Sequence, residues 1–379
     1  MNSLGLYIHI PYCLHKCGYC DFNSHNINTE EMESYVAALL KEMRHYAQGP
    51  AGKKEIVTIF LGGGTPTTLP IHLLEDILKK IRSHFNVSAD CEVTFEANPA
   101  TVALEPLQRM RSAGYNRISI GVQSFHAHEL ALLDRIHSVD EIHLTVDRAK
   151  EAGFDNFSLD LMFALPGQTM SLWEDNISQA LDKNPQHLST YNLTIEPETA
   201  FHKLHSKGKL VMLPDDFQLE FYKKTIQTLT DAGYRHYEIS NFCKPGKESR
   251  HNLIYWNNGE TLGLGAGASS FIKGARFKNC NLPSRYIREI EGNGTAVEFS
   301  ENLEPRQAMG ETLMLGLRLL KGMAIAPFEE RFQTSFEKTF KDVVPPLLEK
   351  NLIIIDKNRI ALSPKGLFLA DSVILEFMA

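Results

Sequence analysis

The stretch LGLYIHIPYCLHKCGYCDF, residues 4–22, contains the two features that decide the fold. Residues 4–10 are mostly apolar on both faces, which is typical of a strand buried inside a parallel sheet. A proline ends this strand, and Cys13, Cys17 and Cys20 follow in a loop with the spacing C-x3-C-x2-C. The stretch therefore predicts a buried sheet with a metal centre just beyond its first strand.

Five more segments of the same strand-like character follow, separated by segments with the 3.6-residue period of amphipathic helices. The six predicted strands are residues 4–10, 56–61, 92–96, 117–122, 157–163 and 187–195. The predicted helices are residues 31–46, 73–85, 104–113, 142–152, 172–181 and 216–232. Such alternation requires right-handed crossovers onto a parallel sheet, so we predict an α/β fold with a partial (β/α)6 barrel.

The pattern changes after a short predicted strand at residues 234–240. Gly- and Asn-rich chain around residues 257–267 indicates a domain edge or a site loop. Helices then follow at 306–320, 327–332 and 336–351, before an alternating hairpin at 352–362 and a last helix from Pro364. We predict a barrel over residues 1–240, a connecting segment over 241–304 and a smaller, helical, winged-helix-like domain over 305–379.

Charge argues against nucleic acid as a partner. The chain has 39 basic and 46 acidic side chains, a formal net charge of -7, so no basic field is available for phosphates. Residues 336–379 carry equal numbers of basic and acidic residues, so the wing-like end is expected to serve structure or partner docking rather than DNA.

Composition places the chain among ordinary globular proteins, with 43% hydrophobic and 22% charged residues. No apolar run approaches the ~20 residues that cross a bilayer, and residues 4–10 are too short and lack the basic flank of a signal peptide. We therefore expect a cytoplasmic protein without a transmembrane segment. Six cysteines are too sparse for a disulfide scaffold in a chain of this length.

The count of three clustered thiols suggests two kinds of metal site. Three thiolates can hold three irons of a [4Fe-4S] cluster and leave the fourth iron open to another ligand. A structural zinc ion needs a fourth protein ligand, which His9, His15 or His25 could supply. Three inert cysteines are a further alternative, whereas the isolated Cys91, Cys243 and Cys280 are interpreted as core residues.

Polar and glycine residues follow the other predicted strands, at the edge where parallel-sheet enzymes build their sites. These residues are Gly62 to Thr65 after strand two, Glu96 and Asn98 after strand three, Gln123 and Ser124 after strand four, Asp160 within strand five, and Thr194 and Glu196 after strand six. Any one of them alone is typical of a turn, a cap or the surface. Their agreement at five strand ends predicts a ligand site there, which Arg135 could also reach.

Several motifs together resemble the radical S-adenosylmethionine (SAM) family, and within it the oxygen-independent coproporphyrinogen oxidase group. They are Tyr7 to Cys13, Cys17 to Phe22, Gly62 to Thr67, Gly121 to Phe125, and Asp160 to Thr169. The resemblance implies that Cys13, Cys17 and Cys20 bind a [4Fe-4S] cluster whose open iron is chelated by SAM. It further implies SAM contacts from Tyr7, Tyr19, Gly63, Gly64, Thr65, Glu96, Gln123, Arg135, Asp160 and, more loosely, Thr194.

Two branches of this group make different predictions. The coproporphyrinogen III dehydrogenases carry an N-terminal extension and a cysteine two positions after the triplet, where this chain has six residues before Tyr7 and has Phe22. The segment 251–256 instead matches the H-N-x-x-Y-W motif of HemW-type heme chaperones. This resemblance implies heme contacts from His251, Asn252, Tyr255 and Trp256.

We therefore predict a heme chaperone that binds heme and a SAM-ligated cluster and delivers heme to an acceptor protein. The alternatives are an oxygen-independent coproporphyrinogen III dehydrogenase, which would make the protein an enzyme, and a zinc-stabilised nucleic-acid-binding protein. The expected partners are the heme acceptor and an electron donor such as flavodoxin or ferredoxin, and a homodimer is left open. A histidine on a loop beside two packed aromatic residues would explain the H-N-x-x-Y-W segment equally well without heme.

Overall fold

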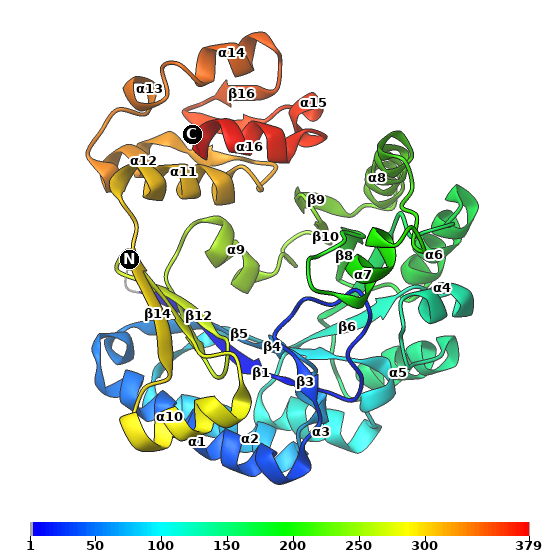
Figure 1. The fold of residues 1–379 in the computed structure, drawn as a ribbon, viewed down its shortest axis with the longest axis vertical. Coiled ribbons are helices and arrows are strands. Elements are labelled where there is room, and N and C mark those ends of the chain that lie inside the picture. The colour runs from blue at the N-terminus through cyan, green and yellow to red at the C-terminus, as the bar shows by residue number, and fades with distance from the viewer. Residues whose placement is uncertain (1–2, 379) are drawn as a thin grey trace.

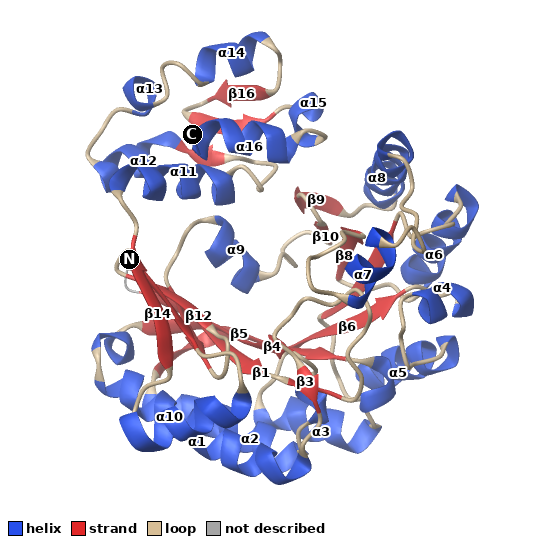
Figure 2. Cartoon of the chain, in the orientation of Figure 1, coloured by secondary structure: helices blue, strands red, loops and turns tan. Residues whose placement is uncertain are grey.

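Six parallel strands form the centre of the protein in the computed structural model, which describes residues 3–378 (Figures 1 and 2). They are β1 (Ser3–Ile10), β4 (Glu55–Gly63), β5 (Asn86–Ala97), β6 (Arg117–Gln123), β7 (Phe157–Phe163) and β8 (His187–Asn192). They lie side by side in the order of the chain, and each pairs in parallel with the next. The predicted partial barrel is confirmed.

Helices connect these strands and cover the outer face of the curved sheet (Figure 2). They are α1 (Thr29–Gln48), α2 (Ile71–His84), α3 (Leu104–Ala113), α4 (Ala127–Leu132), α5 (Val139–Glu151), α6 (Met170–Asp182) and α8 (Asp215–Asp231), whereas α7 (Ala200–Ser206) packs through Phe201 on Tyr19 of the cysteine loop. Gly114 ends α3 with φ 111°, and a Cβ atom there would lie 2.3 Å from the Arg82 guanidinium. Because a side chain rarely adopts this left-handed conformation, glycine fits this stop.

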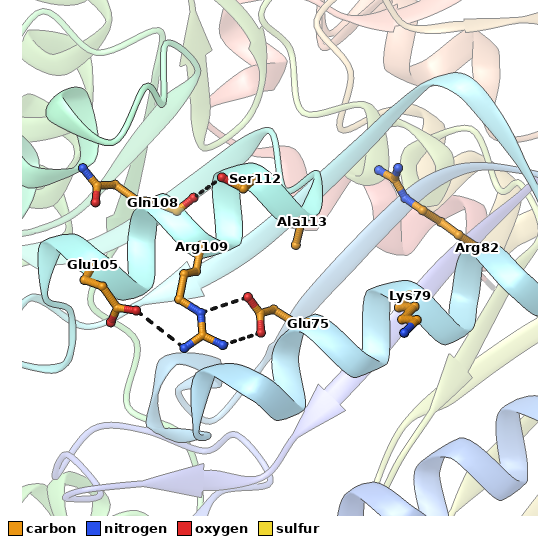
Figure 3. A pocket seen from close by; sticks show the side chains of 8 residues that line it. All are labelled: Glu75, Lys79, Arg82, Glu105, Gln108, Arg109, Ser112 and Ala113. Atoms are coloured by element: carbon orange, nitrogen blue, oxygen red, sulfur yellow. Dashed lines mark hydrogen bonds and ion pairs between the residues drawn. The ribbon is translucent and has the colours of Figure 1, made fainter.

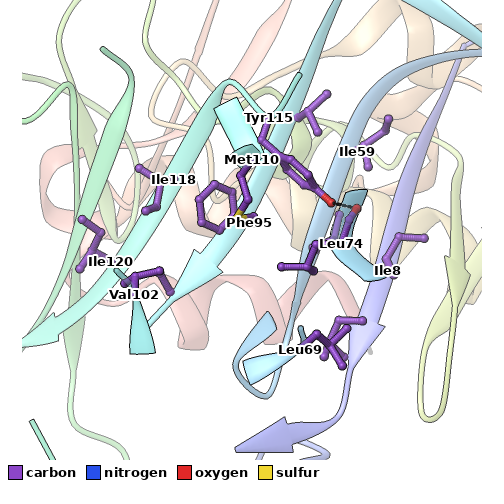
Figure 4. Close-up of a cluster of buried hydrophobic side chains, with 14 of the residues drawn as sticks. Ile8, Ile59, Leu69, Leu74, Phe95, Val102, Met110, Tyr115, Ile118 and Ile120 are labelled. Atoms are coloured by element: carbon purple, nitrogen blue, oxygen red, sulfur yellow. Dashed lines mark hydrogen bonds between the residues drawn. The ribbon is translucent and has the colours of Figure 1, made fainter. Parts of the chain in front are cut away.

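The main hydrophobic core lies between the sheet and these outer helices. Leu6 and Ile8 of β1 are fully buried in this layer, and Phe95 packs edge-on against Tyr115 with ring centroids 5.5 Å apart (Figure 4). The Tyr115 hydroxyl donates to the Leu74 carbonyl oxygen at 2.9 Å, so this buried polar atom has its partner. The opposite, concave face of the sheet is left for polar side chains.

The sheet continues beyond the six strands at both edges. On the β8 side it adds β10 (Asn241–Cys243) and β9 (Arg235–Glu238), both antiparallel. On the β1 side it adds β11 (Thr261–Leu264), parallel to β1, followed by the antiparallel β12 (Ser269–Ile272), β13 (Ala275–Asn279) and β14 (Val297–Asn302), with α10 (Pro283–Asn293) before β14. The chain therefore passes residue 240 without leaving the sheet. Residues 257–267, interpreted from the sequence as a domain edge or a site loop, include the buried strand β11.

Helix α9 (Arg250–Trp256) lies over the concave face of the sheet, between it and the C-terminal domain (Figure 1). The His251 backbone N–H donates to the Glu92 carboxylate of β5 at 3.1 Å, and the His251 ring stacks on Phe60 of β4 at 5.2 Å. Contacts from two strands thus hold this short helix against the sheet.

The C-terminal domain has its own small sheet and its own core. Its elements are α11 (Pro305–Gly316), β15 (Met323–Ala324), α12 (Ile325–Phe332), α13 (Phe336–Thr339), α14 (Val344–Glu349), β16 (Ile353–Asp356), β17 (Arg359–Leu362), α15 (Pro364–Leu367) and α16 (Ala370–Met378). The helix predicted over 336–351 is two short helices, because prolines at 345 and 346 start a new helix rather than continue one. The predicted smaller helical domain with a hairpin is confirmed.

Among residues 3–378, no helix combines the length and the apolar character that crossing a membrane requires.

Candidate functional site

An outer cavity of about 360 Å³ opens at the carboxyl ends of the parallel strands. It brings together residues predicted from almost every strand end. Those lining it are Cys13, Cys17, Cys20, Tyr19, Gly63, Gly64, Thr65, Glu96, Gln123, Arg135, Asp160 and Thr194. Twelve of the thirteen residues expected at the cluster and at SAM therefore share one cavity, and Tyr7 is the exception.

The cysteine loop is held against the glycine turn that follows β4. The Gly64 and Thr65 backbone N–H groups donate to the carbonyl oxygens of Ile10 and Tyr12, each at 2.8 Å. A Cβ atom on Gly64 would lie 2.7 Å from the Tyr12 carbonyl oxygen, so a larger residue would force the two segments apart. Cys13 itself lies in β2 (Tyr12–Cys13), which pairs with β3 (His25–Asn26) and closes the loop at its base.

The chemistry of the loop fits an iron–sulfur cluster. All three thiols border the outer cavity, and soft sulfur ligands favour such clusters. The Arg135 guanidinium donates to the Cys17 sulfur at 3.3 Å, while its buried Nε has no partner among the described residues. As these side chains stand, no group of three or more His, Cys, Asp or Glu residues within 3–378 is close enough to hold a metal ion.

The three histidines considered as a fourth zinc ligand have other partners. His9 contacts the Tyr7 hydroxyl and the Asn23 carbonyl oxygen, at 3.0 and 2.8 Å. His15 contacts the Asp134 carboxylate at 2.8 Å, and His25 contacts the Asn23 side chain at 3.1 Å. Each imidazole is thus engaged away from the thiols. The isolated Cys91, Cys243 and Cys280 are buried, as expected of core residues.

Two carboxyl groups lie between the outer cavity and the interior of the barrel. Glu96 accepts from the Gly63 backbone N–H at 3.2 Å, and burial, reinforced by nearby Asp160, raises the pKa of Glu96 to about 8. Burial also raises the pKa of Asp160, although the Ser119 hydroxyl donates to it at 3.0 Å. At neutral pH the Glu96 carboxyl therefore carries a proton that it can donate to a ligand.

The turn after β6 holds Gln123 in a strained conformation. Its φ of 65° is unusual for a residue other than glycine. The next residues are fixed by a buried network, in which the Ser124 hydroxyl donates to Glu129 at 2.5 Å and the Asn176 amide donates to the same carboxylate at 2.9 Å. Because these partners define the turn, Gln123 is directed into the outer cavity.

Tyr7 lines a separate inner cavity of about 200 Å³, beneath α9. Three residues of the H-N-x-x-Y-W motif, His251, Asn252 and Tyr255, line the same cavity. The two cavities share Glu96, Ser119, Asp160 and Tyr191, so they are neighbouring compartments of one interior.

His251 lies in helix α9, not on a loop, and only 1% of its surface is exposed. Its Nδ1 and the Thr58 hydroxyl are 2.8 Å apart, and its Nε2 and the Tyr255 hydroxyl are 3.1 Å apart. Burial lowers the pKa of His251 to about 3, so the imidazole is neutral at pH 7. Direct coordination of heme iron by His251 stays a prediction, and it would require one of these two hydrogen bonds to break.

Trp256 faces the other way, toward the C-terminal domain. The Arg318 guanidinium lies over the Trp256 ring, 4.4 Å from its centroid, and pairs with the buried Glu238 of β9 at 3.5 Å. The Ile239 backbone N–H donates to the Arg318 carbonyl oxygen at 3.1 Å. One face of α9 thus borders the inner cavity while its end supports the C-terminal domain.

Several residues of these cavities were not predicted from the sequence. Arg117, Ser119, His187 and Ser189 line the inner cavity from within β6 and β8. The alternation of residues along a strand could have indicated them, because Arg117, Ser119, Gly121 and Gln123 share one face of β6.

A hollow of about 580 Å³ also lies outside the barrel, between α2 and α3 (Figure 3). Its charged residues satisfy one another: the Arg109 guanidinium donates to both oxygens of Glu75, at 3.0 and 2.5 Å, and approaches Glu105 at 3.5 Å. Exposed pairs of this kind are common on helix surfaces and indicate no ligand.

Comparison with known proteins agrees with this geometry. A model of the radical SAM superfamily matches residues 7–180, and a model of the HemN C-terminal domain matches residues 303–369. The solved structure of coproporphyrinogen III oxidase (HemN) from Escherichia coli, titled a radical SAM enzyme, superposes with a TM-score of 0.86 over 100% of this chain and 90% of that one, at 24% identity. That identity supports the fold alone.

Two relatives that are more similar in sequence carry the name heme chaperone HemW. The heme chaperone HemW of Escherichia coli (strain K12) is 44% identical over 358 residues, which is 92% of this chain and 90% of the relative. The heme chaperone HemW of Bacillus subtilis (strain 168) is 38% identical over 373 residues, which is 98% of both chains. The chain therefore belongs to the heme chaperone HemW family of the radical SAM superfamily.

Proposed function

We propose that this protein is a cytoplasmic heme chaperone, which binds a SAM-ligated [4Fe-4S] cluster and heme and transfers heme to an acceptor protein. The observation that carries the proposal is the placement of the H-N-x-x-Y-W helix against a cavity that adjoins the cysteine-lined one. Two relatives named heme chaperone HemW, matched over at least nine tenths of both chains, support it.

In this proposal Cys13, Cys17 and Cys20 hold three irons of the cluster. A reduced cluster of this type supplies one electron to the sulfonium of bound SAM. The cationic Arg135 suits the methionyl carboxylate, and its unpartnered Nε is available for such a contact. The protonated Glu96 can donate to a ribose hydroxyl, its carbonyl oxygen can accept from the amine, and the backbone at Gly63 and Gly64 allows a close approach. Tyr19, Thr65, Gln123, Asp160 and Thr194 complete the proposed contacts.

The heme part of the proposal involves α9. Tyr255 and Trp256 provide flat aromatic surface, Tyr255 toward the inner cavity and Trp256 toward the C-terminal domain, and His251 provides an imidazole next to Tyr255. Asn252 lines the inner cavity next to Tyr255. Tyr7, which the resemblance assigns to SAM, borders this compartment, and its ring stacks on Phe60 with centroids 6.3 Å apart. An electron donor and a second copy of the chain remain expected partners under this proposal.

One anaerobic preparation tests the proposal. The reconstituted protein is examined by EPR with and without SAM and is then titrated with hemin. We expect a cluster signal that SAM perturbs and a saturable Soret band that His251→Ala weakens, while the exposed control His45→Ala leaves it unchanged. The absence of a saturable Soret band would overturn the heme-chaperone proposal.

The same preparation decides the alternative function. With reductant, SAM and coproporphyrinogen III, a dehydrogenase would oxidatively decarboxylate two propionates and release protoporphyrinogen. We expect no such product, because Phe22, exposed at the edge of the outer cavity, stands where those enzymes carry a further cysteine. Formation of protoporphyrinogen would favour the dehydrogenase instead.

A further inference from the structure

The inner cavity contains a buried arginine without a direct partner. Arg117, the first residue of β6, is 2% exposed and borders this cavity. Its Nε is fully buried and has no hydrogen-bond partner among residues 3–378, and its charge acts on Asp160 and Glu96 only through space. A buried guanidinium costs several kcal/mol unless an anion or hydrogen-bond acceptors contact it, so Arg117 is suited to hold an anion.

The other ionisable groups of the cavity are already engaged within the protein. His187 contacts the Ser158 and Tyr237 hydroxyls at 2.8 and 2.9 Å. The imidazole of His251 contacts Thr58 and Tyr255, as described above. Among the residues that line this cavity, Arg117 is the one with a buried polar atom that lacks a partner.

The two carboxyl groups nearby leave room for an anion. The raised pKa of Glu96, about 8 because of burial and then Asp160, means that Glu96 is neutral at pH 7. The Asp160 carboxylate accepts from the Ser119 and Ser158 hydroxyls at 3.0 and 3.2 Å. Burial raises its pKa and the Arg117 charge lowers it through space, without a direct ion pair between the two side chains among the described residues. Neither group therefore occupies the anion position at the guanidinium.

We propose that the inner cavity is a carboxylate-binding site in which Arg117 is the anchoring cation. A planar guanidinium matches the two oxygens of a carboxylate, which makes this the natural anionic partner. The cavity volume of about 200 Å³ lies below the roughly 300 Å³ at which whole small-molecule sites begin, so it suits a short acid or one arm of a larger ligand.

Two sources could supply this carboxylate. One is a free short monocarboxylate, and the other is a propionate arm of heme, which rests on the proposed heme-binding function. In the second case Asn252 and Tyr255 of α9 would also border the propionate arm. The site would then select porphyrins by their side chains, independently of the ligand that the iron takes.

The first experiment compares hemin with hemin dimethyl ester, which lacks both carboxylates, by Soret titration. We expect the wild-type protein to bind hemin about tenfold more tightly than the ester, as a charge-assisted contact requires. Arg117→Gln should lower the affinity for hemin to that for the ester and leave the ester unaffected. Arg117→Lys should recover part of the difference, and Arg109→Gln, which removes an equal charge from the outer helices, should change nothing.

The second experiment does not depend on heme. Thermal unfolding is measured in sodium propionate and in sodium chloride at equal ionic strength, for the wild type and for Arg117→Lys and Arg117→Gln. Protection of the wild type by propionate, lost in Arg117→Gln, supports the site with a free acid as its ligand. If the protein binds hemin more tightly than its ester but sodium propionate does not protect it from thermal unfolding, the ligand of the site is the propionate side chain of heme.

The two experiments separate this inference from the proposed function. If hemin binds saturably but equals its ester, and propionate gives no protection, the carboxylate site is overturned while the chaperone proposal stands. If hemin does not bind at all, the chaperone proposal fails. The unfolding experiment in sodium propionate then decides by itself whether the carboxylate site exists. The wild-type comparisons remain decisive even if Arg117→Gln does not fold.

Discussion

Cys13, Cys17 and Cys20 border the outer cavity, whereas Cys91 is buried in β5 and is 6% exposed. We therefore expect that Cys13→Ala, Cys17→Ala or Cys20→Ala abolishes cluster assembly, because a [4Fe-4S] cluster with two protein thiolates loses an anchored iron. Cys91→Ala is the matched control and should retain the cluster. Iron and sulfide analysis after anaerobic reconstitution measures both, and equal losses in all four variants would contradict this assignment of roles.

The buried His251 should make stability depend on pH. Its pKa is about 6.5 in the unfolded chain and is lowered to about 3 by burial, so the unfolded state binds more protons between these values. Stability contributed by the neutral imidazole is therefore complete above pH 6.5 and is lost as the pH falls toward 3. We expect the wild type to lose about 2 kcal/mol more than His251→Gln between pH 6.5 and pH 5.

Urea unfolding of the two proteins at several pH values measures this difference. Burial also lowers the pKa values of His9, His137 and His236, to about 4, but these residues are common to both proteins and cancel in the comparison. If the unfolding free energies of the two proteins depend on pH in parallel, His251 can take up a proton in the folded state as readily as in the unfolded chain, and the expected lowering of its pKa would be contradicted.

Single residues were predictable where a motif or a strand end marked them. The outer-cavity residues follow strands whose carboxyl ends must meet, so their proximity could be inferred from chain order. Tyr7 lies within β1 and Arg117 begins β6, so both face the barrel interior farther from that edge. Which interior residues share a cavity depends on how α9 covers the sheet, which no local pattern reveals.

The glycine turn after β4 sets the position of the cysteine loop. Gly64→Ala would place a Cβ atom 2.7 Å from the Tyr12 carbonyl oxygen, and overpacking of this kind costs about 1–3 kcal/mol. We expect the variant to lose iron and sulfide and to unfold at lower urea concentration. Gly292→Ala is the control, since this position in α10 has no atom within 4 Å, and there alanine should stabilise by about 0.5–1 kcal/mol.

Strands and helices were predictable where the periodicity of the apolar residues and the length of the segment indicated the same structure. The six central strands and most helices repeat a clear alternation, and the structure confirms them. Strand β11 (Thr261–Leu264) was missed because it has only four residues and lies in a glycine-rich segment. It is ordered by its pairing with β1. The break between α13 and α14 was missed although two prolines marked it. The periodicity of a short segment indicates its secondary structure, but it does not reveal which distant strand the segment pairs with.

The barrel and the C-terminal domain have separate hydrophobic cores among the described residues. Phe340 lies at the centre of the C-terminal core, fully buried against Phe336 and Phe377 with ring centroids 5.2 and 5.3 Å away. We expect Phe340→Ala to cost about 3–5 kcal/mol of local stability through the cavity it leaves. Because the barrel core does not include these residues, cluster content should be retained while amide hydrogens of residues 305–378 exchange faster.

Phe95→Ala provides the reciprocal control in the barrel core, where Phe95 packs against Tyr115 and Phe154, each at 5.5 Å. This change should lower cluster content together with stability. Hydrogen exchange followed by mass spectrometry distinguishes the two variants. Uniform acceleration of exchange along the chain in Phe340→Ala would mean that the two cores unfold as one unit.

Helix α9 connects these two parts, since His251 faces the inner cavity and Trp256 supports Arg318 of the C-terminal domain. Both contacts are made by one helix of seven residues, Arg250–Trp256. An occupant of the inner cavity that shifted α9 would alter the contact of Trp256 with Arg318, and thermodynamic reciprocity would then require that contact to alter the occupant's affinity by the same factor. Binding and release of the occupant would then both depend on the same coupling free energy between the inner cavity and the C-terminal domain.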